Sequence, residues 1–83
     1  MATYMSKLHV DETYIVEPTE ILPFGVKVYI PELKEHNFVH ISNIIPGFCK
    51  DINEHVVIGQ KYKAWAVEGH VKPIELKLYD PEE

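Results

Sequence analysis

The chain has 83 residues, of which 46% are hydrophobic and 25% charged, so it can form one small domain and is too hydrophobic for a disordered chain. Thirteen acidic against eight basic residues give a net charge of −5, which argues against tight, unselective binding of nucleic acid, because that affinity comes largely from neutralising phosphates. A single cysteine excludes an intramolecular disulfide, and no apolar run approaches the roughly 20 residues of a membrane helix. With no signal-peptide core in residues 1–7, we expect a cytoplasmic protein that does not contact a membrane.

Prolines are spread along the chain and disfavour long helices, while the segments between them alternate apolar and polar residues, as strands do. The alternation predicts five strands, at residues 12–17, 25–30, 38–42, 60–67 and 74–78. Residues 43–57 contain Pro46-Gly47 and a polar run, which indicate a loop with a helical turn. This order predicts an all-β fold, a five-stranded antiparallel Greek-key barrel of the OB-fold type. We expect residues 1–9 to form a lead segment, 10–79 the barrel domain and 80–83 an acidic tail.

Strand alternation assigns residues of the second, third and fourth strands to the core or to the surface. The expected interior residues are Val26, Val28, Ile30, Val39, Ile41, Tyr62, Ala64 and Ala66. The expected outward residues are Lys27, Tyr29, Phe38, His40, Lys61, Lys63 and Trp65. Burial of the interior set would close the barrel without a disulfide or a metal.

Three short motifs stand at or near the starts of predicted strands. They are Phe24-Gly25, then Val39-His40-Ile41-Ser42, and then Ile58-Gly59-Gln60. In this order and spacing they resemble the RNA-binding repeat of ribosomal protein S1, a family of OB-fold domains, over residues 10–78. The resemblance implies a small protein that contacts single-stranded RNA in translation, RNA decay or transcription, with modest affinity, no cofactor and no reaction of its own.

The RNA surface of the S1 family combines two aromatic residues around the glycine of the second strand, a histidine on the third strand, and an Asp and an Arg near the last hairpin. By position, Phe24 matches the first aromatic residue and His40 matches the histidine. Lys27 takes the place of the second aromatic residue, which removes a stacking ring and adds a cation. The Arg falls near Lys72 or Pro73, and the Asp falls at a residue without a carboxylate.

Tyr29 lies on the same outward face as Lys27, one pleat further along, and could supply the missing ring. We hypothesise that Lys27, Tyr29, Phe38 and His40 form the working surface. The predicted RNA-binding residues are Phe24, Lys27, Tyr29, Phe38, His40 and Lys72. Ordinary surface positions remain the alternative for Tyr29 and His40.

Two aromatic residues leave alternatives open. Phe24 has the parity of Val26 and Val28, which points it into the core, whereas a bulge at Gly25 would turn it outward. Trp65 is expected to face outward at a position that is usually polar in the S1 family. We expect residues 4–8 to fold back over Trp65, and the alternative is a protein-binding spot.

Other chemistries lack the residues they need. Five histidines are scattered along the chain, without a cysteine pair or a His-Glu-x-x-His motif, so we expect no metal site. No phosphate-binding loop or nucleophile motif occurs, so we expect no catalysis. The rival to an RNA-binding protein is an acidic OB-fold interaction module or decoy that docks on a protein component of a ribosome, nuclease or polymerase. A weaker alternative is a piece of a larger enzyme that presents RNA to a catalytic part.

Overall fold

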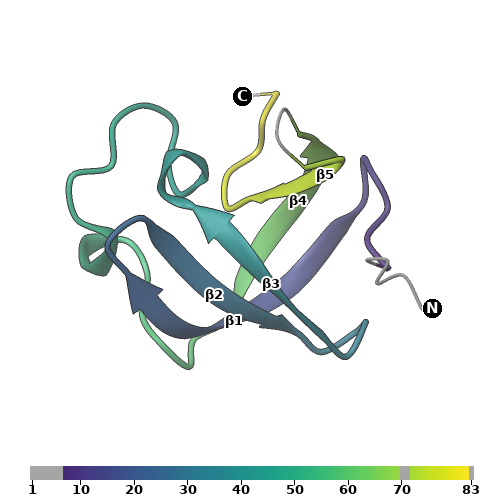
Figure 1. The fold of residues 1–83 in the computed structure, drawn as a ribbon, viewed down its shortest axis with the longest axis horizontal. Helices are drawn as coiled ribbons and strands as arrows, with labels where there is room; N and C mark the ends of the chain where they lie inside the picture. The colour runs from purple at the N-terminus through teal and green to yellow at the C-terminus, as the bar shows by residue number, and fades with distance from the viewer. Residues whose placement is uncertain (1–6, 70–71, 83) are drawn as a thin grey trace.

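A computed structural model describes residues 7–69 and 72–82, and these form a five-stranded antiparallel sheet that curls into a barrel (Figure 1). The strands are β1 (Thr13–Leu22), β2 (Gly25–Ile30), β3 (Glu35–His40), β4 (Tyr62–Glu68) and β5 (Ile74–Lys77). Their order across the sheet is β3-β2-β1-β4-β5. Two short 3-10 helices, η1 (Ile41–Asn43) and η2 (Ile52–Glu54), lie in the connection between β3 and β4. The predicted all-β barrel, with helical turns after the third strand, is confirmed.

The long strand β1 joins the two halves of the barrel. Its first residues, from Thr13 to Val16, pair with β4, and its later residues pair with β2. The pairing with β2 shifts register between Pro18 and Glu20. The predicted first strand, residues 12–17, is therefore too short, because β1 continues past Pro18 to Leu22. A proline has no N–H to donate, and a strand accepts it at an irregular position where the ladder does not need that hydrogen bond.

The third strand begins and ends earlier than predicted. Its first residue, Glu35, pairs with Ile30, because the turn between β2 and β3 is tight and places Lys34 at a positive φ of 52°. The strand ends at His40, whose ring nitrogen accepts a hydrogen bond from the backbone N–H of Ser42 and caps η1. Residues 41 and 42, predicted as strand, therefore start a helical turn instead.

The predicted interior residues form the centre of the core. At most 1% of the surface is exposed for Val26, Val28, Ile30, Val39, Ala64 and Ala66. Tyr62 and Ile41 are partly buried and pack against this centre, Ile41 from η1 rather than from a strand. Leu76 of β5 and Ile52 of η2 are also buried, so the β3–β4 connection supplies part of the core.

Polar contacts of Asn43 join the two edges of the sheet. The backbone N–H of Leu78 donates to the carbonyl of Asn43 at 2.9 Å, and the Asn43 amide donates to a Glu75 carboxylate oxygen at 3.3 Å. At the other end of β3, the backbone N–H of Lys7 donates to the Glu35 carboxylate at 2.9 Å. These bonds hold segments from both ends of the chain against the barrel. Among the described residues, none of the helical turns has the length and hydropathy to span a membrane.

Candidate nucleic-acid interface

Two phenylalanine rings lie side by side on the outer surface, where β2 begins and β3 ends. The ring centroids of Phe24 and Phe38 are 5.6 Å apart, and the ring planes are inclined by 44°. Phe24 is 56% exposed, and Phe38 is partly buried. Proteins that bind single strands use exposed rings of this kind as platforms on which bases stack.

Phe24 faces outward because it stands in the two-residue turn between β1 and β2. Leu22 and Gly25 pair across this turn, so the alternation of β2 begins after Phe24. Of the two alternatives left open by the sequence, the exposed one is observed. The expected cause was wrong, however, because β2 has no bulge at Gly25 and the register irregularity of this hairpin lies in β1, between Pro18 and Glu20.

Gly25 lets the ring of Phe38 lie across β2. A Cβ atom on residue 25 would collide with the Cζ edge of the Phe38 ring and would stand 2.5 Å from the Val39 carbonyl oxygen. Phe38 pairs with Lys27 in the ladder, and Gly25 pairs with His40, so the ring reaches diagonally across the hairpin. The glycine of the Phe-Gly motif therefore provides space for an aromatic side chain of the neighbouring strand.

Lys72 brings a positive charge to the same place from the β4–β5 loop. Its Nζ atom lies 5.8 Å from the centroid of the Phe38 ring, within the range of a cation–π interaction. Lys72 is exposed, so its ammonium group can also meet a phosphate. The β1–β2 turn and the β4–β5 loop, which are distant in the sequence, thus both place a side chain against Phe38.

His40 presents a hydrogen-bond donor next to the rings. Its Nδ1 atom accepts a hydrogen bond from the Ser42 backbone N–H at 3.1 Å and lies 2.8 Å from the Ser42 Oγ atom. A neutral histidine that accepts at Nδ1 carries its proton on Nε2. The side chain is exposed, so this Nε2–H can donate to a phosphate or to a base. We call Phe24, Phe38, His40 and Lys72 the aromatic cluster.

Lys27, another predicted site residue, is engaged by a carboxylate. Its Nζ atom lies 3.4 Å from Glu20 Oε1, on the neighbouring strand, and both side chains are more than half exposed. Exposed ion pairs of this kind contribute about 0–1 kcal/mol to stability. The pair therefore matters less for stability than for binding, because the negative charge of Glu20 reduces the attraction of Lys27 for a phosphate.

Tyr29 lies apart from the aromatic cluster. It pairs in the ladder with His36, and the two rings meet edge to face with centroids 4.9 Å apart. Four residues separate Tyr29 from Gly25, which corresponds to about 13 Å along a strand. The predicted working surface is thus divided into the aromatic cluster and a Tyr29–His36 pair. His36 was missed because the predicted third strand began too late, and alternation from Glu35 would have placed it on the face of His40.

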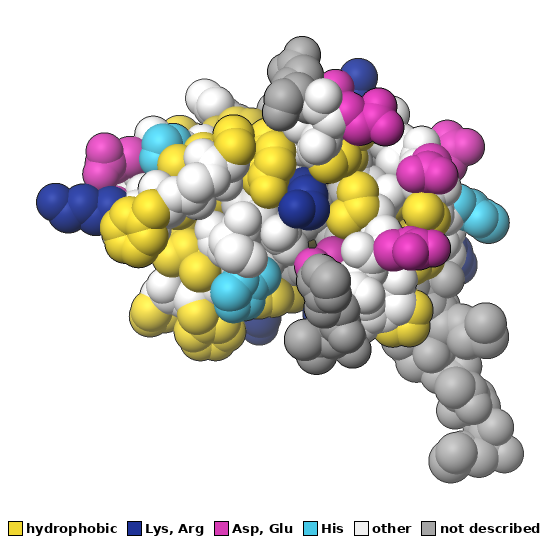
Figure 2. Space-filling model, turned by 90° about the horizontal axis from the view of Figure 1, so that it is seen from above, with side chains coloured by type: hydrophobic (Ala, Val, Ile, Leu, Met, Phe, Trp, Pro, Cys, Tyr) yellow, Lys and Arg dark blue, Asp and Glu magenta, His cyan; other side chains and the backbone are white. Residues whose placement is uncertain are grey.

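A shallow pocket of about 370 Å³ adjoins the aromatic cluster. It opens between the β1–β2 turn and η2, and its apolar lining comes from Ile21, Leu22, Pro23, Ile41 and Ile52. Figure 2 shows hydrophobic side chains gathered on the side of the molecule that carries the β3–β4 connection, and Asp and Glu side chains mainly on the opposite side. The negative net charge is therefore unevenly distributed over this view of the surface.

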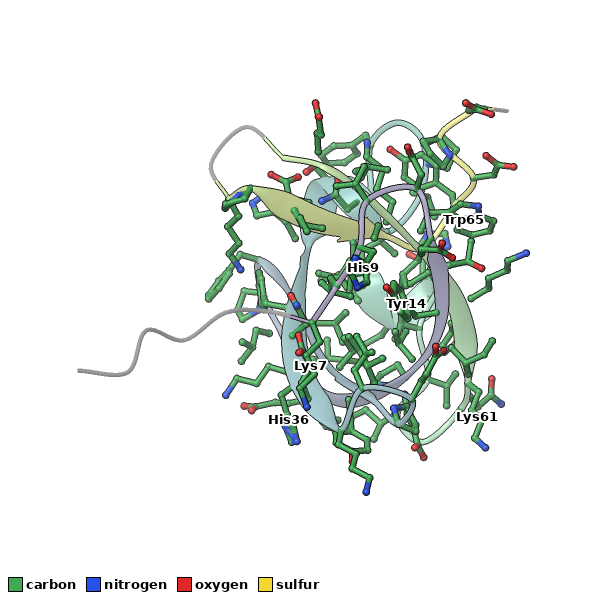
Figure 3. All side chains as sticks on the ribbon, turned by 90° about the vertical axis from the view of Figure 1, so that its right-hand side faces the viewer. Lys7, His9, Tyr14, His36, Lys61 and Trp65 are labelled. Carbon is green, nitrogen blue, oxygen red and sulfur yellow. The ribbon has the colours of Figure 1, made fainter. Side chains whose placement is uncertain are left out.

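Trp65 lies on β4, on another wall of the barrel. Its ring is partly buried, with Lys63 Nζ 5.2 Å from the ring centroid. Figure 3 shows Trp65 projecting away from the barrel, apart from Lys7. The side chain of Lys7 donates to the Leu33 carbonyl, so this part of the lead segment lies against the β2–β3 turn. Residues 4–6 of the predicted cover lie outside the described residues.

A metal centre finds no support in the part of the chain that the structure describes. In residues 7–69 and 72–82, no group of three or more His, Cys, Asp or Glu side chains is placed to hold a metal ion. His36 instead lies edge to face with the Tyr29 ring, and His40 caps η1.

Similarity to known proteins supports the same fold. No protein-family model matches the chain. General stress protein 13 of Bacillus subtilis (strain 168) is 33% identical over 75 residues, which are 88% of this chain and 57% of that protein. The solution structure of GSP13 from Bacillus subtilis has a TM-score of 0.69 at 29% identity, over 93% of this chain and 65% of that chain.

A chain in the crystal structure of the a/eIF2alpha–aDim2p–rRNA complex from Pyrococcus horikoshii OT3 has a TM-score of 0.76 at 21% identity, over 88% of this chain and 45% of that chain. The present chain thus spans about half to two thirds of the length of these proteins. The five-stranded antiparallel barrel agrees with these likenesses. The fold of the described residues is therefore S1-like, a five-stranded barrel of the OB-fold type.

Proposed function

We propose that this domain binds single-stranded RNA through the aromatic cluster and carries out no reaction of its own. The supporting observation is the convergence of Phe24, Phe38 and Lys72 from three separate segments, with ring centroids at 5.6 Å and the ammonium group 5.8 Å from a ring. Base stacking needs exposed rings, and the RNA backbone needs a nearby cation. His40 adds a hydrogen-bond donor two residues along β3 from Phe38, on the same face of the strand. The cluster therefore combines the interactions that a short stretch of single strand requires.

The expected affinity is modest. Stacking contributes about 1–3 kcal/mol per base, so two rings contribute about 2–6 kcal/mol. A dissociation constant of 1 mM corresponds to about 4 kcal/mol and one of 1 μM to about 8 kcal/mol. Lys27 is engaged with Glu20 and the chain carries a charge of −5, so electrostatic attraction adds little. We expect micromolar or weaker binding that declines further as salt is added.

The similar proteins support a role with RNA. The structure from Pyrococcus horikoshii is, by its name, a complex that contains rRNA, and part of one chain in it, 45% of that chain, is similar in fold to the present chain. The similarity to General stress protein 13 extends over most of this chain. A cytoplasmic role in translation, RNA decay or transcription is part of this proposal.

Nuclear magnetic resonance titration with a short RNA tests the proposal. A uridine tetranucleotide should shift the amide signals of Gly25, Phe38 and His40 at about 20 mM salt and bind more weakly at about 150 mM salt. Phe24→Ala and Phe38→Ala should each weaken binding about tenfold, the equivalent of one stacked base. Phe48→Ala is the matched control, because Phe48 is 86% exposed and lies in the β3–β4 connection.

Two results would contradict the proposal. The first is an absence of RNA binding even at about 20 mM salt, which would favour the acidic protein-interaction module instead. The second is an equal loss of binding in Phe48→Ala and Phe38→Ala, which would mean that RNA adheres to any exposed ring. Circular dichroism of each variant establishes that the barrel is intact.

A further inference from the structure

The outer face of β4 and β5 carries two lysine–aromatic pairs. Lys63 Nζ lies 5.2 Å from the centroid of the Trp65 ring, and Lys77 Nζ lies 5.2 Å from the centroid of the Tyr79 ring. Lys77 Nζ also donates to the Tyr79 hydroxyl at 3.2 Å. Trp65 and Lys77 are paired in the β4–β5 ladder, so the two pairs adjoin. We call Lys63, Trp65, Lys77 and Tyr79 the lysine–aromatic strip.

The strip is positively charged in a chain whose net charge is −5. In residues 7–69 and 72–82 neither of its lysines forms an ion pair with a carboxylate, whereas Lys27 is paired with Glu20. The carboxylate of Glu75, which belongs to the same strand as Lys77, accepts a hydrogen bond from the Asn43 amide. The ammonium groups of the strip thus lie over aromatic rings and remain available to an anion.

The chemistry of the strip fits RNA better than a protein. Cations over the faces of Trp and Tyr rings combine charge for a phosphate with a surface for a base. Protein interfaces are also rich in Trp and Tyr, but their centres are depleted of Lys. The strip instead places a lysine against each of its rings. A single RNA strand can use both features of the strip, with phosphates for the ammonium groups and unpaired bases for the rings.

The strip is connected to the aromatic cluster by β5. Lys72, which lies over Phe38, precedes Lys77 by five residues, which corresponds to about 16 Å of extended chain. Phe38 and His40 lie on β3, whereas Lys63, Trp65 and Lys77 lie on β4 and β5, so the two surfaces belong to different walls of the barrel. Figure 3 shows Trp65 on the side of the barrel away from His36, which lies near the start of β3. A strand that leaves Phe38 beside Lys72 can reach the strip by following β5. OB-folds engage about 4–16 nucleotides, and the longer sites in this range suffice for such a path.

We propose that RNA longer than the aromatic cluster can hold continues past Lys72 along β5 and binds the lysine–aromatic strip. This inference rests on the proposed function, since the ligand is the same RNA. The strip increases the length of RNA that the domain engages and adds phosphate contacts. It accounts for the outward position of Trp65 and for the lysines that surround it.

Fluorescence of Trp65 reports directly on the strip, because the chain has one tryptophan. A uridine dodecamer should change the fluorescence of Trp65, and a uridine tetramer that binds only the aromatic cluster should not. Both RNAs should shift the amide signal of Phe38. This difference separates occupation of the strip from occupation of the cluster.

A double variant measures the contribution of the strip. Lys63→Gln with Lys77→Gln should weaken dodecamer binding about tenfold at low salt and leave tetramer binding unchanged. Because each phosphate contact on a single strand contributes about 0.7 to the slope of log affinity against log salt, the slope should fall by about 1.4. Lys7→Gln with Lys34→Gln changes the net charge equally and serves as the control. Both control lysines lie next to Leu33 at the β2–β3 turn.

The outcomes distinguish this inference from the function on which it rests. If the dodecamer binds while Trp65 is unresponsive and the double variant binds like the wild type, the inference is wrong and the proposed function stands. If the control variant loses as much affinity as the strip variant, net charge alone explains the effect and the inference is again wrong. If neither RNA binds the wild type, both proposals fall.

Discussion

The ring of Phe38 lies across the position where a side chain on Gly25 would stand. A Cβ atom there would meet the Phe38 ring on one side and the Val39 carbonyl oxygen, at 2.5 Å, on the other. The ring could move, but the carbonyl belongs to the β2–β3 ladder and is held by the pairing of Val26 with Val39. Gly25 therefore couples the stability of the hairpin to the position of a stacking ring.

Gly25→Ala should lower both stability and RNA affinity. Overpacking of this kind costs about 1–3 kcal/mol, and displacement of the Phe38 ring removes a stacking platform. Urea denaturation should show the lower free energy of unfolding, and titration with the uridine tetranucleotide should show the weaker binding. The control is Gly47→Asn, at a position with a positive φ of 92° where a Cβ atom would have no neighbour within 4 Å, so backbone strain alone lowers its stability and its RNA affinity should be unchanged. Wild-type behaviour of Gly25→Ala would show that the hairpin adjusts freely.

Glu20→Gln should strengthen RNA binding. The substitution removes the carboxylate that lies 3.4 Å from Lys27 Nζ, which leaves this ammonium group available to a phosphate. The slope of log affinity against log salt should steepen by about 0.7, and stability should change by less than about 1 kcal/mol. Isothermal titration at several salt concentrations measures the slope. Glu32→Gln, at an exposed position in the β2–β3 turn, makes the same change in net charge, and an equal gain there would exclude a specific effect of the ion pair.

Asn43→Ala should destabilise the barrel by about 1–3 kcal/mol. The side chain of Asn43 is buried and its amide donates to Glu75 at 3.3 Å, so its removal withdraws a hydrogen bond from a carboxylate on β5. Urea denaturation measures the loss. Asn53→Ala is the control, because Asn53 is exposed and bonds only locally to Asp51, and it should cost at most about 0.5 kcal/mol. Equal stability of the two variants would mean that Asn43 does not help to close the sheet.

His40→Ala should weaken RNA binding more than Lys27→Ala does. Loss of the Nε2–H donor removes a hydrogen bond of about 0.5–1.5 kcal/mol, which corresponds to roughly 2- to 12-fold in affinity. Lys27→Ala should have a smaller effect, about twofold, because Glu20 already engages this lysine. Titration of the single and double variants provides the comparison, with His55→Ala as a histidine control in an exposed loop. Unchanged binding in the double variant would exclude both residues from the working surface.

The strand β2 was predicted to the residue, because its alternation is regular and its two ends are marked by Gly25 and by Pro31. The first and third strands were predicted with wrong bounds, the first at an irregular register inside β1 and the third at the turns on either side of β3. Alternation describes a strand only while the pairing is regular. The irregular register after Pro18 and the cap that His40 makes for η1 depend on neighbouring segments. Local pattern alone therefore could not place these ends.

In the candidate site, too, local sequence patterns predicted individual residues, whereas the contacts between them depend on the tertiary structure. The sequence motifs predicted Phe24 and His40 as site residues, and alternation predicted Phe38 and Lys27 on the outer face. The contact of Phe38 with Lys72 and the ion pair of Lys27 with a carboxylate of β1 follow from pairing between distant segments. The pairing of Trp65 with Lys77 of β5 also joins segments that are distant in the sequence. None of these contacts is encoded by spacing along the chain.

The sequence by itself determined which side chains are buried and which class of barrel they build, because the two-residue repeat of a strand follows from local backbone geometry. The tertiary structure alone decided which exposed side chains meet. Closure of the barrel sets the register of every strand pair and the path of every loop. Register and loop path depend on contacts between distant segments, so no local stretch of sequence fixes them. That closure brings Lys72 over Phe38 and turns two separate positions into one surface.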